Sequence, residues 1–514
     1  MDERAVAITR DGLGRELGRE ALGAARRLGL TGSLMMAVGA LGGGALPVPQ
    51  PLQGLRLLGL PGRNPTLSVA VLYTGMALVV IAWWRVARQL SAPAGTIDRR
   101  DLTRIAVSWA VPLAAAPPLF SRDVYSYLAQ GATLAHGLDP YRLGPAPALG
   151  VDHPLVRSVP ALWRNTPSPY GPLFTMISRA LVGMTGDDVV AGIFAQRLVA
   201  LVGLALVVWA LPRLARRAGA DPDRAFWLGA AHPLVLFHIV SGAHNDGLMV
   251  GLAMVGLEIG LQGLDGAAAE MRDPRLVIGP ALIVAASAVK VPALLALGYF
   301  GMLWARRQGG RWTNVAMVGG YLTLVTLAVY LPLTFVVGPR SLAAPALATS
   351  VISLMSLPTD LALVLGRIGV LLGFGDQTGA ALAVVGGVAA AVAAVIVLGT
   401  LVAALRTDRE PLALLAVGLT AVGVLAAPTE PWYLLWALVP FAATPAKAGV
   451  LRVVTLSTLA TALLLPPTGT DFVARGFELV NALGAAMVML VVVLLAEGRR
   501  RPRLAAVRGV ERDG

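Results

Sequence analysis

Apolar stretches long enough to cross a membrane recur from one end of this sequence to the other. A membrane-spanning helix needs roughly 20 consecutive, mainly apolar residues. By that measure the stretches predict about fourteen passes, with 277–304 counted as two short half-helices. The stretches are 28–45, 67–87, 104–120, 191–211, 225–240, 247–263, 277–304, 314–336, 380–405, 412–427, 432–443, 450–466 and 477–496. The expected fold class is therefore an all-α polytopic membrane protein.

Composition supports this class and excludes others. The chain is 56% hydrophobic and 14% charged, whereas soluble proteins carry about 25% charged residues. The absence of Cys excludes disulfides, thiolate metal sites and Cys nucleophiles. The net charge of +13 does not indicate a nucleic-acid partner, because the charges lie mainly in loops beside apolar stretches.

The distribution of Lys and Arg predicts the orientation in the membrane. Thirty of the 42 lie in the two termini and in alternate loops, and only ten lie in the opposite loops. Because positive residues favour the cytosolic side, both termini should be cytosolic and 121–190 external. This gives a cytosolic segment 1–27, a transmembrane domain 28–496 with external loops 121–190 and 337–379, and a basic cytosolic tail 497–514.

The stretch 277–304 has basic residues beyond both of its ends, so both ends should be cytosolic. It is too short for two full crossings at ~1.5 Å per residue. Val289-Lys290-Val291-Pro292 offers a break near its middle. We therefore expect a hairpin that stops partway, with Lys290 near mid-membrane.

Three amphipathic pieces in the external segments predict helices that lie on the membrane surface. Two of them, 124–136 and 172–183, fall in the first loop, and 360–373 falls in the second.

Arg122 and Asp123 stand where an apolar stretch ends and the first external loop begins, followed by Tyr125 and Tyr127. Ser121 or Asp123 could simply be the N-cap of a helix. Alternatively, Asp123 could act as a general base, with the neighbouring Arg122 holding an anion and the tyrosines edging a sugar site.

Two short external turns carry further candidates. His244-Asn245-Asp246 is explained equally well by turn chemistry and by a polar ligand. Glu430, Trp432 and Tyr433 could form a sugar platform, although Trp and Tyr at a membrane edge are more often anchors.

Lys290 and Arg197 are cations within apolar stretches, which makes them functional candidates. Lys290 could instead reach the interface or pair with carbonyls. Arg197 could pair structurally with Glu258, or it could meet a phosphate group.

The sequence lacks a P-loop, a GxGxxG after a strand and an HExxH. A cytosolic nucleotide-sugar donor therefore has no obvious site, and any donor should arrive in the membrane.

Taken together, several motifs carry a resemblance to a known family. They are 122–127, 137–141, 168–173 (which contains Tyr170), 244–249, 289–290 and 431–433. With an acid that opens a long external loop, the chain resembles the GT-C glycosyltransferases. It resembles most closely the polyprenol-phosphomannose-dependent α-1,6-mannosyltransferases of lipomannan assembly, over about residues 30–495.

The resemblance implies a bacterial plasma-membrane enzyme with an external active site. Mannose would pass from a polyprenyl phosphate carrier to the 6-hydroxyl of a growing α-1,6-mannan glycolipid, with inversion. Asp123 would be the base, and Arg122, Lys290 or Arg197 would stabilise the leaving phosphate. Tyr125, Tyr127, Tyr170, His244, Asn245, Asp246, Glu430, Trp432 and Tyr433 would contact the sugars. Such transfers need no nucleotide and often no metal, so no cofactor is expected.

A transporter or flippase for a lipid or polar solute is the alternative function, because many-helix bundles with an intramembrane Lys occur in that class too. The long external loop with an acid at its root favours transfer, since transport does not require it.

Overall fold

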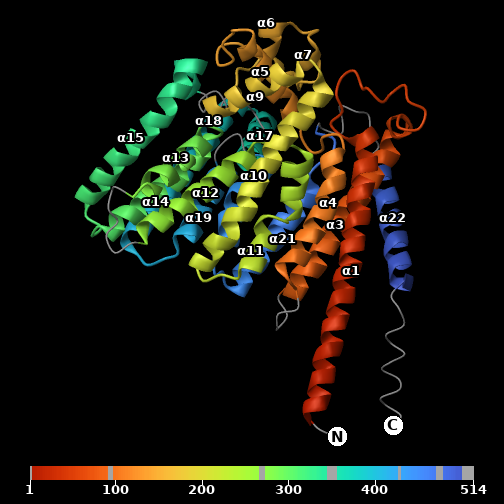
Figure 1. The fold of residues 1–514 in the computed structure, drawn as a ribbon. Helices are drawn as coiled ribbons and strands as arrows, with labels where there is room; N and C mark the ends of the chain where they lie inside the picture. Colours follow the sequence, from red (N-terminus) through yellow and green to blue (C-terminus); the bar gives the residue numbers. More distant parts are fainter. Residues whose placement is uncertain are drawn as a thin grey trace. The chain divides into compact units, whose positions relative to one another are not determined.

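The computed structural model describes residues 3–90, 97–265, 273–343, 356–425, 430–469 and 479–500. The described residues form helices and contain no strand, which confirms the all-α expectation. Their helices divide between two compact units (Figure 1).

Unit 1 contains residues 1–46, 50–121 and 466–514. Its helices are α1 (Glu3–Gly43), α2 (Leu60–Arg63), α3 (Pro65–Leu90), α4 (Arg99–Ala115) and α22 (Leu479–Arg500). α1 is one continuous helix, so the predicted cytosolic segment and the first apolar stretch share it. α3 joins α22 through the Arg85–Glu497 ion pair at 2.6 Å, and Trp109 of α4 donates to the Arg26 carbonyl of α1 at 3.0 Å.

Unit 2 contains residues 47–49 and 122–465. Its first helices are α5 (Asp123–Ala135), α6 (Pro145–Leu149), α7 (Pro154–Arg157), α8 (Ala161–Arg164), α9 (Pro172–Thr185), α10 (Val189–Arg217), α11 (Pro222–Gly229) and the π-helix η1 (Val235–Ser241). The next are α12 (Asp246–Leu264), α13 (Arg275–Ser287), η2 (Val291–Ala293), α14 (Leu294–Arg307), α15 (Trp312–Val337) and η3 (Pro339–Ala343). The last are α17 (Leu357–Leu371), α18 (Thr378–Arg406), α19 (Pro411–Leu425), η4 (Pro431–Tyr433), α20 (Leu434–Ala442) and α21 (Ala448–Leu464).

Six helices of the described residues are long and apolar enough to cross a membrane, namely α3, α10, α12, α15, α18 and α22. Several other apolar helices, including α13, α19 and α21, are shorter. Large apolar side chains on α15 and α18, such as Leu324, Phe335 and Val395, are exposed, as expected where lipid is the solvent. The polytopic membrane class stands, while the number of fourteen passes stays a prediction.

The core of unit 2 is α12, which is buried over most of its length. A Cβ atom on Gly251 of α12 would lie 2.3 Å from the carbonyl oxygen of Gly203 on α10. Only glycine permits this contact, because the two backbones touch there. α12 is thereby fixed against α10, and its first residue, Asp246, is placed at one end of the unit.

The segment 275–307 forms the expected interrupted hairpin beside α12. Its two ends meet the same end of α12, because Arg275 lies against Gly263 and Arg307 donates to the carbonyl of Leu264. At the break, Lys290 adopts an extended backbone (φ −156°, ψ 126°) between α13 and η2.

The position of Lys290 differs from the expectation. Its side chain reaches Asp246 in the first turn of α12, so it lies beside the first residue of that helix rather than halfway along it. The reason is length: α13 contributes 13 residues, or ~20 Å of rise, and therefore follows most of α12.

The helices predicted to lie on the surface, 124–136 and 172–183, correspond to α5 and α9. In Figure 1 they gather with α6 and α7 at one end of α10. α5 and α9 pack closely, because a Cβ atom on Gly131 would lie 2.5 Å from the backbone of Ser178. This end of unit 2 carries the polar residues described next.

Candidate active site

Asp123 is the first residue of α5, and its side chain is 19% exposed. The N-cap position belongs to Arg122, which makes no side-chain cap bond. The alternative in which Ser121 or Asp123 is the N-cap therefore does not describe this helix start. An acid in the first turn is still favoured by the helix dipole.

His244 lies between two carboxylates. Its Nδ1 atom is 3.7 Å from Oδ2 of Asp123 and 3.7 Å from Oδ2 of Asp246. The imidazole is fully buried. The three side chains thus form a compact acid–His–acid group, with spacings slightly beyond hydrogen-bond length.

The backbone before His244 is unusual. The π-helix η1 ends at Ser241, and Ala243 then takes a positive φ of 54°. A non-glycine residue in this region costs about 1–3 kcal/mol and persists only where its surroundings enforce it. Both π-helices and such backbone outliers gather at functional sites.

Asp246 anchors three elements. Its Oδ1 atom accepts from Lys290 Nζ at 3.0 Å and from the indole nitrogen of Trp436 at 2.6 Å. The carboxylate is fully buried and the Lys290 side chain is 14% exposed. Because charge-assisted hydrogen bonds are about twice as strong as neutral ones, this contact ties α12, the 288–291 break and α20 together.

Aromatic rings cover the Lys290 ammonium. It lies 4.4 Å from the centroid of Tyr433 and 5.2 Å from that of Trp436. These two rings stack on each other with centroids 4.0 Å apart. The lysine is therefore held by cation–π contacts in addition to the ion pair.

A second aromatic group comes from the segment 121–190. Tyr127 packs edge-on against Tyr170 at 4.9 Å and against Phe174 at 4.8 Å. Its hydroxyl donates to Asn245 Oδ1 at 3.4 Å. Burial, together with Asp123, raises the pKa of Tyr127 well above its ordinary value, so the phenol remains a donor.

The loop 168–172 is docked on the hairpin break. The N–H groups of Gly171 and Leu173 donate to the carbonyls of Val289 and Ala288, at 3.1 and 3.0 Å. A Cβ atom on Gly171 would lie 2.3 Å from the Ala288 carbonyl oxygen, so glycine is required for this approach. Two motifs far apart in the sequence thus meet at Gly171 and Val289.

Several polar atoms near His244 are buried and have no hydrogen-bond partner among the described residues. They are Ser241 Oγ, both ring nitrogens of His244, Asn245 Nδ2, Asp246 Oδ2 and Trp432 Nε1. Buried polar groups are normally satisfied, so this concentration indicates a place for a polar ligand or for water.

The two arginines bind backbone carbonyls. Arg122 donates to Ser158 through Nε and an Nη at 3.1 and 2.9 Å. Arg197 donates to Val240 and Ser241 at 3.1 and 3.0 Å, and it does not pair with Glu258, which contacts Arg217 instead. Arg197 therefore holds the end of η1, immediately before the His244 turn.

The remaining predicted residues also lie in this region. Trp432 packs against His244 with ring centroids 4.6 Å apart. The Tyr125 ring receives the Arg122 guanidinium, 4.9 Å from its centroid. Glu430 occupies the N-cap position of η4, and its carbonyl accepts from Tyr433.

Sequence reasoning missed Trp436, Phe174 and His238. The Trp432/Trp436 spacing of i and i+4 was a usable signal, because it puts both rings on one side of a helical turn. His238 packs 5.6 Å from His244, but nothing in an apolar stretch indicates that pairing. No group of three or more His, Asp or Glu with the geometry of a metal site occurs in the described part of the chain.

The comparisons with known proteins give the class and then the family. Residues 26–306 match the family described as "Alpha-(1->6)-mannopyranosyltransferase, N-terminal domain", and residues 358–495 match the "MptB C-terminal domain". The protein is thus a membrane glycosyltransferase by class. It belongs to the alpha-(1->6)-mannopyranosyltransferase family, which confirms the resemblance inferred from the sequence motifs.

Relatives match over nearly the whole chain. A probable alpha-(1->6)-mannopyranosyltransferase of Mycolicibacterium smegmatis is 39% identical, over 93% of this chain and 89% of that protein. An alpha-(1->6)-mannopyranosyltransferase of Mycobacterium tuberculosis is 38% identical, over 94% and 88% respectively. Alpha-(1->6)-mannopyranosyltransferase B of Corynebacterium glutamicum is 34% identical, over 89% and 81%. No solved structure matches the chain.

The buried pair of Lys290 and Asp246 generates a prediction on stability. Lys290→Met leaves the Asp246 charge buried without its partner and should cost about 3–5 kcal/mol of folding free energy. Thermal unfolding of the purified protein in detergent measures this loss. The double variant Lys290→Met/Asp246→Asn removes both charges and should recover most of it. A single variant as stable as the parent would contradict the assignment of this pair as structural.

Proposed function

We propose that this protein transfers mannose from a polyprenyl phosphate carrier to the 6-hydroxyl of a growing α-1,6-mannan glycolipid, at the outer face of the plasma membrane. The observation that carries the proposal is the meeting of Asp123, His244, Asp246 and Lys290 at one end of unit 2. Family membership favours transfer over transport.

Asp123 is the general base in this proposal. It takes the proton of the acceptor 6-hydroxyl as that oxygen attacks the anomeric carbon from the face opposite the leaving group. The bond from the anomeric carbon to the carrier phosphate breaks, and polyprenyl phosphate leaves. A β-linked donor then gives an α product. Asp123 suits this role because it is the partly exposed member of the acid–His–acid group, whereas Asp246 is fully buried and already bonded.

His244 and Asp246 organise the site. With Nδ1 near both carboxylates, His244 can orient Asp123 by a hydrogen bond when substrate tightens the site, since such contacts are often long in the free enzyme. The unpartnered atoms Asp246 Oδ2 and Asn245 Nδ2 are suited to sugar hydroxyls. Trp432, Tyr433, Tyr127 and Tyr170 supply apolar ring faces and edges for a pyranose.

Lys290 is the proposed contact of the leaving phosphate. It is the cation of the site whose charge pairs with a carboxylate rather than with backbone carbonyls, and its side chain is 14% exposed. Arg122 and Arg197 act on the phosphate indirectly, because their guanidinium groups hold the Ser158 loop and the η1 end.

The role of Asp123 has a direct test. Asp123→Asn should reduce transfer to an α-1,6-mannoside acceptor by at least a hundredfold, since general-base catalysis contributes about 10²–10⁴. Membranes with radiolabelled polyprenyl-phosphomannose measure product and linkage. Asp152→Asn, an exposed acid in the same loop, is the matched control and should be near normal. Near-normal turnover of Asp123→Asn would contradict the assignment of Asp123 as the general base.

The role of Lys290 needs a background in which Asp246 is not left unpaired. We compare the double variant Lys290→Met/Asp246→Asn with Asp246→Asn alone. The double variant should have an apparent KM for the polyprenyl donor about ten- to a hundredfold higher, because it has lost one charged contact with the phosphate. The KM for the acceptor should change little. Equal KM values for the two variants would mean that Lys290 only neutralises Asp246.

The orientation rests on the split of Lys and Arg between loops and is tested by labelling. Single Cys residues can be introduced freely, because the chain has none. Val151→Cys in the first external loop should react with an impermeant maleimide in intact cells, and Arg216→Cys at the end of α10 should not. Both positions are exposed in the fold, so access from one side of the membrane decides the outcome. The reverse pattern would put the site in the cytosol.

A further inference from the structure

A cavity lies at the end of unit 2 opposite Asp246, and it takes no part in the site described above. Its volume is ≈ 600 Å³, and it is lined by the last turns of α10, α12 and α14 together with the segment that leads into α19. A cavity of this size is within the roughly 300–1,000 Å³ usual for small-molecule sites. By the charge pattern of the loops, this end faces the cytosol.

Arginines supply most of the charged lining of the cavity. Arg217, Arg306, Arg307 and Arg409 line it, against the acids Asp408 and Glu410. The lining therefore carries more positive than negative groups.

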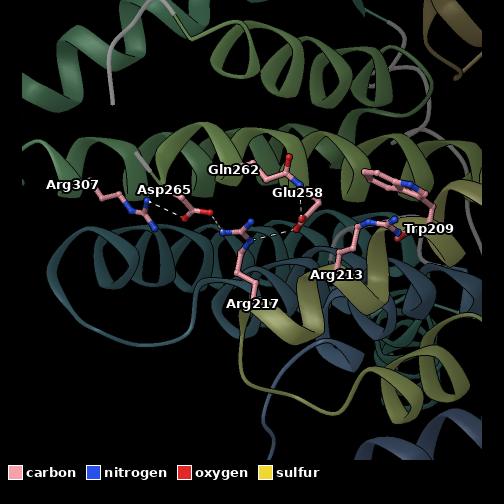
Figure 2. Close-up of polar contacts among 7 residues, drawn as sticks. All are labelled: Trp209, Arg213, Arg217, Glu258, Gln262, Asp265 and Arg307. Carbon is pink, nitrogen blue, oxygen red and sulfur yellow. Dashed lines mark hydrogen bonds and ion pairs between the residues drawn. The ribbon is translucent and has the colours of Figure 1, made fainter. Parts of the chain in front are cut away.

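Figure 2 shows how two of these arginines are held. Arg217 contacts Glu258 at 3.4 Å and also binds Asp265, and Arg307 contacts the same Asp265 at 3.7 Å. One carboxylate is thus shared by two guanidinium groups, which keeps both at the cavity wall with donors to spare.

Glu258 and Asp265 thus pair with Arg217 and Arg307, and the two acids of the lining itself neutralise Arg306 and Arg409 only in part. Asp408, which binds Arg306, is 98% exposed at its side chain, so water screens it. Glu410 accepts from the N–H of Ala413 at 2.7 Å at the start of α19, and burial raises its pKa. The side chain of Arg409 has no ion-pair partner among the described residues and is exposed.

The rest of the lining is apolar. Leu257, Leu261, Phe300, Leu303, Leu412 and Leu415 form it. A small anion such as free phosphate would use the arginines and leave these side chains against water. An amphiphile with a phosphate headgroup and an acyl chain would satisfy both parts.

We propose that this cavity binds an anionic phospholipid, with its phosphate among Arg217, Arg307 and Arg409 and the upper part of one chain along Leu257 and Leu261. Basic pockets between transmembrane helices on the cytoplasmic side recognise lipid headgroups in this way. The proposal does not depend on the chemistry assigned to Asp123.

The test uses the full-length protein in a neutral detergent, titrated with phosphatidylglycerol and followed by native mass spectrometry. Phosphatidylcholine, which has no net charge, is titrated in parallel. The parent should bind phosphatidylglycerol in preference. Arg409→Gln, which breaks no ion pair and so keeps the fold, should raise the Kd about fivefold, the effect of one cation worth about 1 kcal/mol beside an anionic lipid. Arg217→Gln should do so at least as strongly.

The chain offers a matched control on the same helix. Arg213 lies one turn before Arg217, with its guanidinium over the Trp209 ring at 4.2 Å and outside the cavity lining (Figure 2). Arg213→Gln removes the same charge and should leave the Kd unchanged. Equal losses for Arg213→Gln and Arg409→Gln, or equal binding of the two lipids by the parent, would overturn the proposal.

A competition experiment with a soluble phosphate ester distinguishes a bound lipid from a soluble phosphate ligand. Glycerol phosphate in millimolar excess should not displace the bound lipid, because it lacks the chain that contacts the leucines. Displacement would assign the cavity to soluble phosphate esters and would overturn the lipid as its occupant.

Discussion

The buried carboxylate of Asp246 is the interaction on which the rest of the candidate site depends. A fully buried acid is strongly unfavourable unless it is paired and hydrogen-bonded. Here Lys290 and Trp436 both bind one of its oxygens, and they come from the hairpin break and from α20. Three elements far apart in the sequence must therefore converge before the charge is satisfied. Folding of this end of unit 2 and assembly of the site are the same event.

The hydrogen bonds of Asp246 leave one of its oxygens free to face His244, and through His244 the buried acid is linked to Asp123. One carboxylate oxygen of Asp246 accepts the hydrogen bonds from Lys290 and Trp436, and the other oxygen faces His244. His244 in turn stands equally far from Asp123. Because Asp123 is the first residue of α5, the group links the buried core residue Asp246 to a partly exposed residue where the acceptor is proposed to bind. Rigid support behind a partly exposed acid is the requirement for a positioned base.

The sequence predicted the helical class, the break of the hairpin at 289–292 and most of the residues that meet around His244, while the roles of those residues stay predictions. These succeeded because each rests on a local rule: apolar length for the helices, Pro292 for the break, and polar residues at the ends of apolar stretches for the site. The position of Lys290 along α12 could not be predicted in the same way. It depends on how α13 runs against α12, which is fixed by backbone contact between Gly256 and Gly279. Trp436 was missed for a similar reason, since its role depends on the buried acid that it meets.

Arg122, Arg197 and Lys290 bind different partners because their charged groups differ in shape. A guanidinium presents several donors in one plane, so Arg122 and Arg197 each bind backbone carbonyls through two nitrogens and remain buried. An ammonium is a compact point charge on a flexible stem, and Lys290 can turn its remaining donors toward a ligand while one stays on Asp246. Sequence alone gave all three the same candidate role, because it reports charge and position but not the carbonyls that the fold brings near. The strained Ala243 backbone follows from the same division: Arg197 holds the end of η1, and the chain must turn sharply at Ala243 to bring His244 beside Asp123.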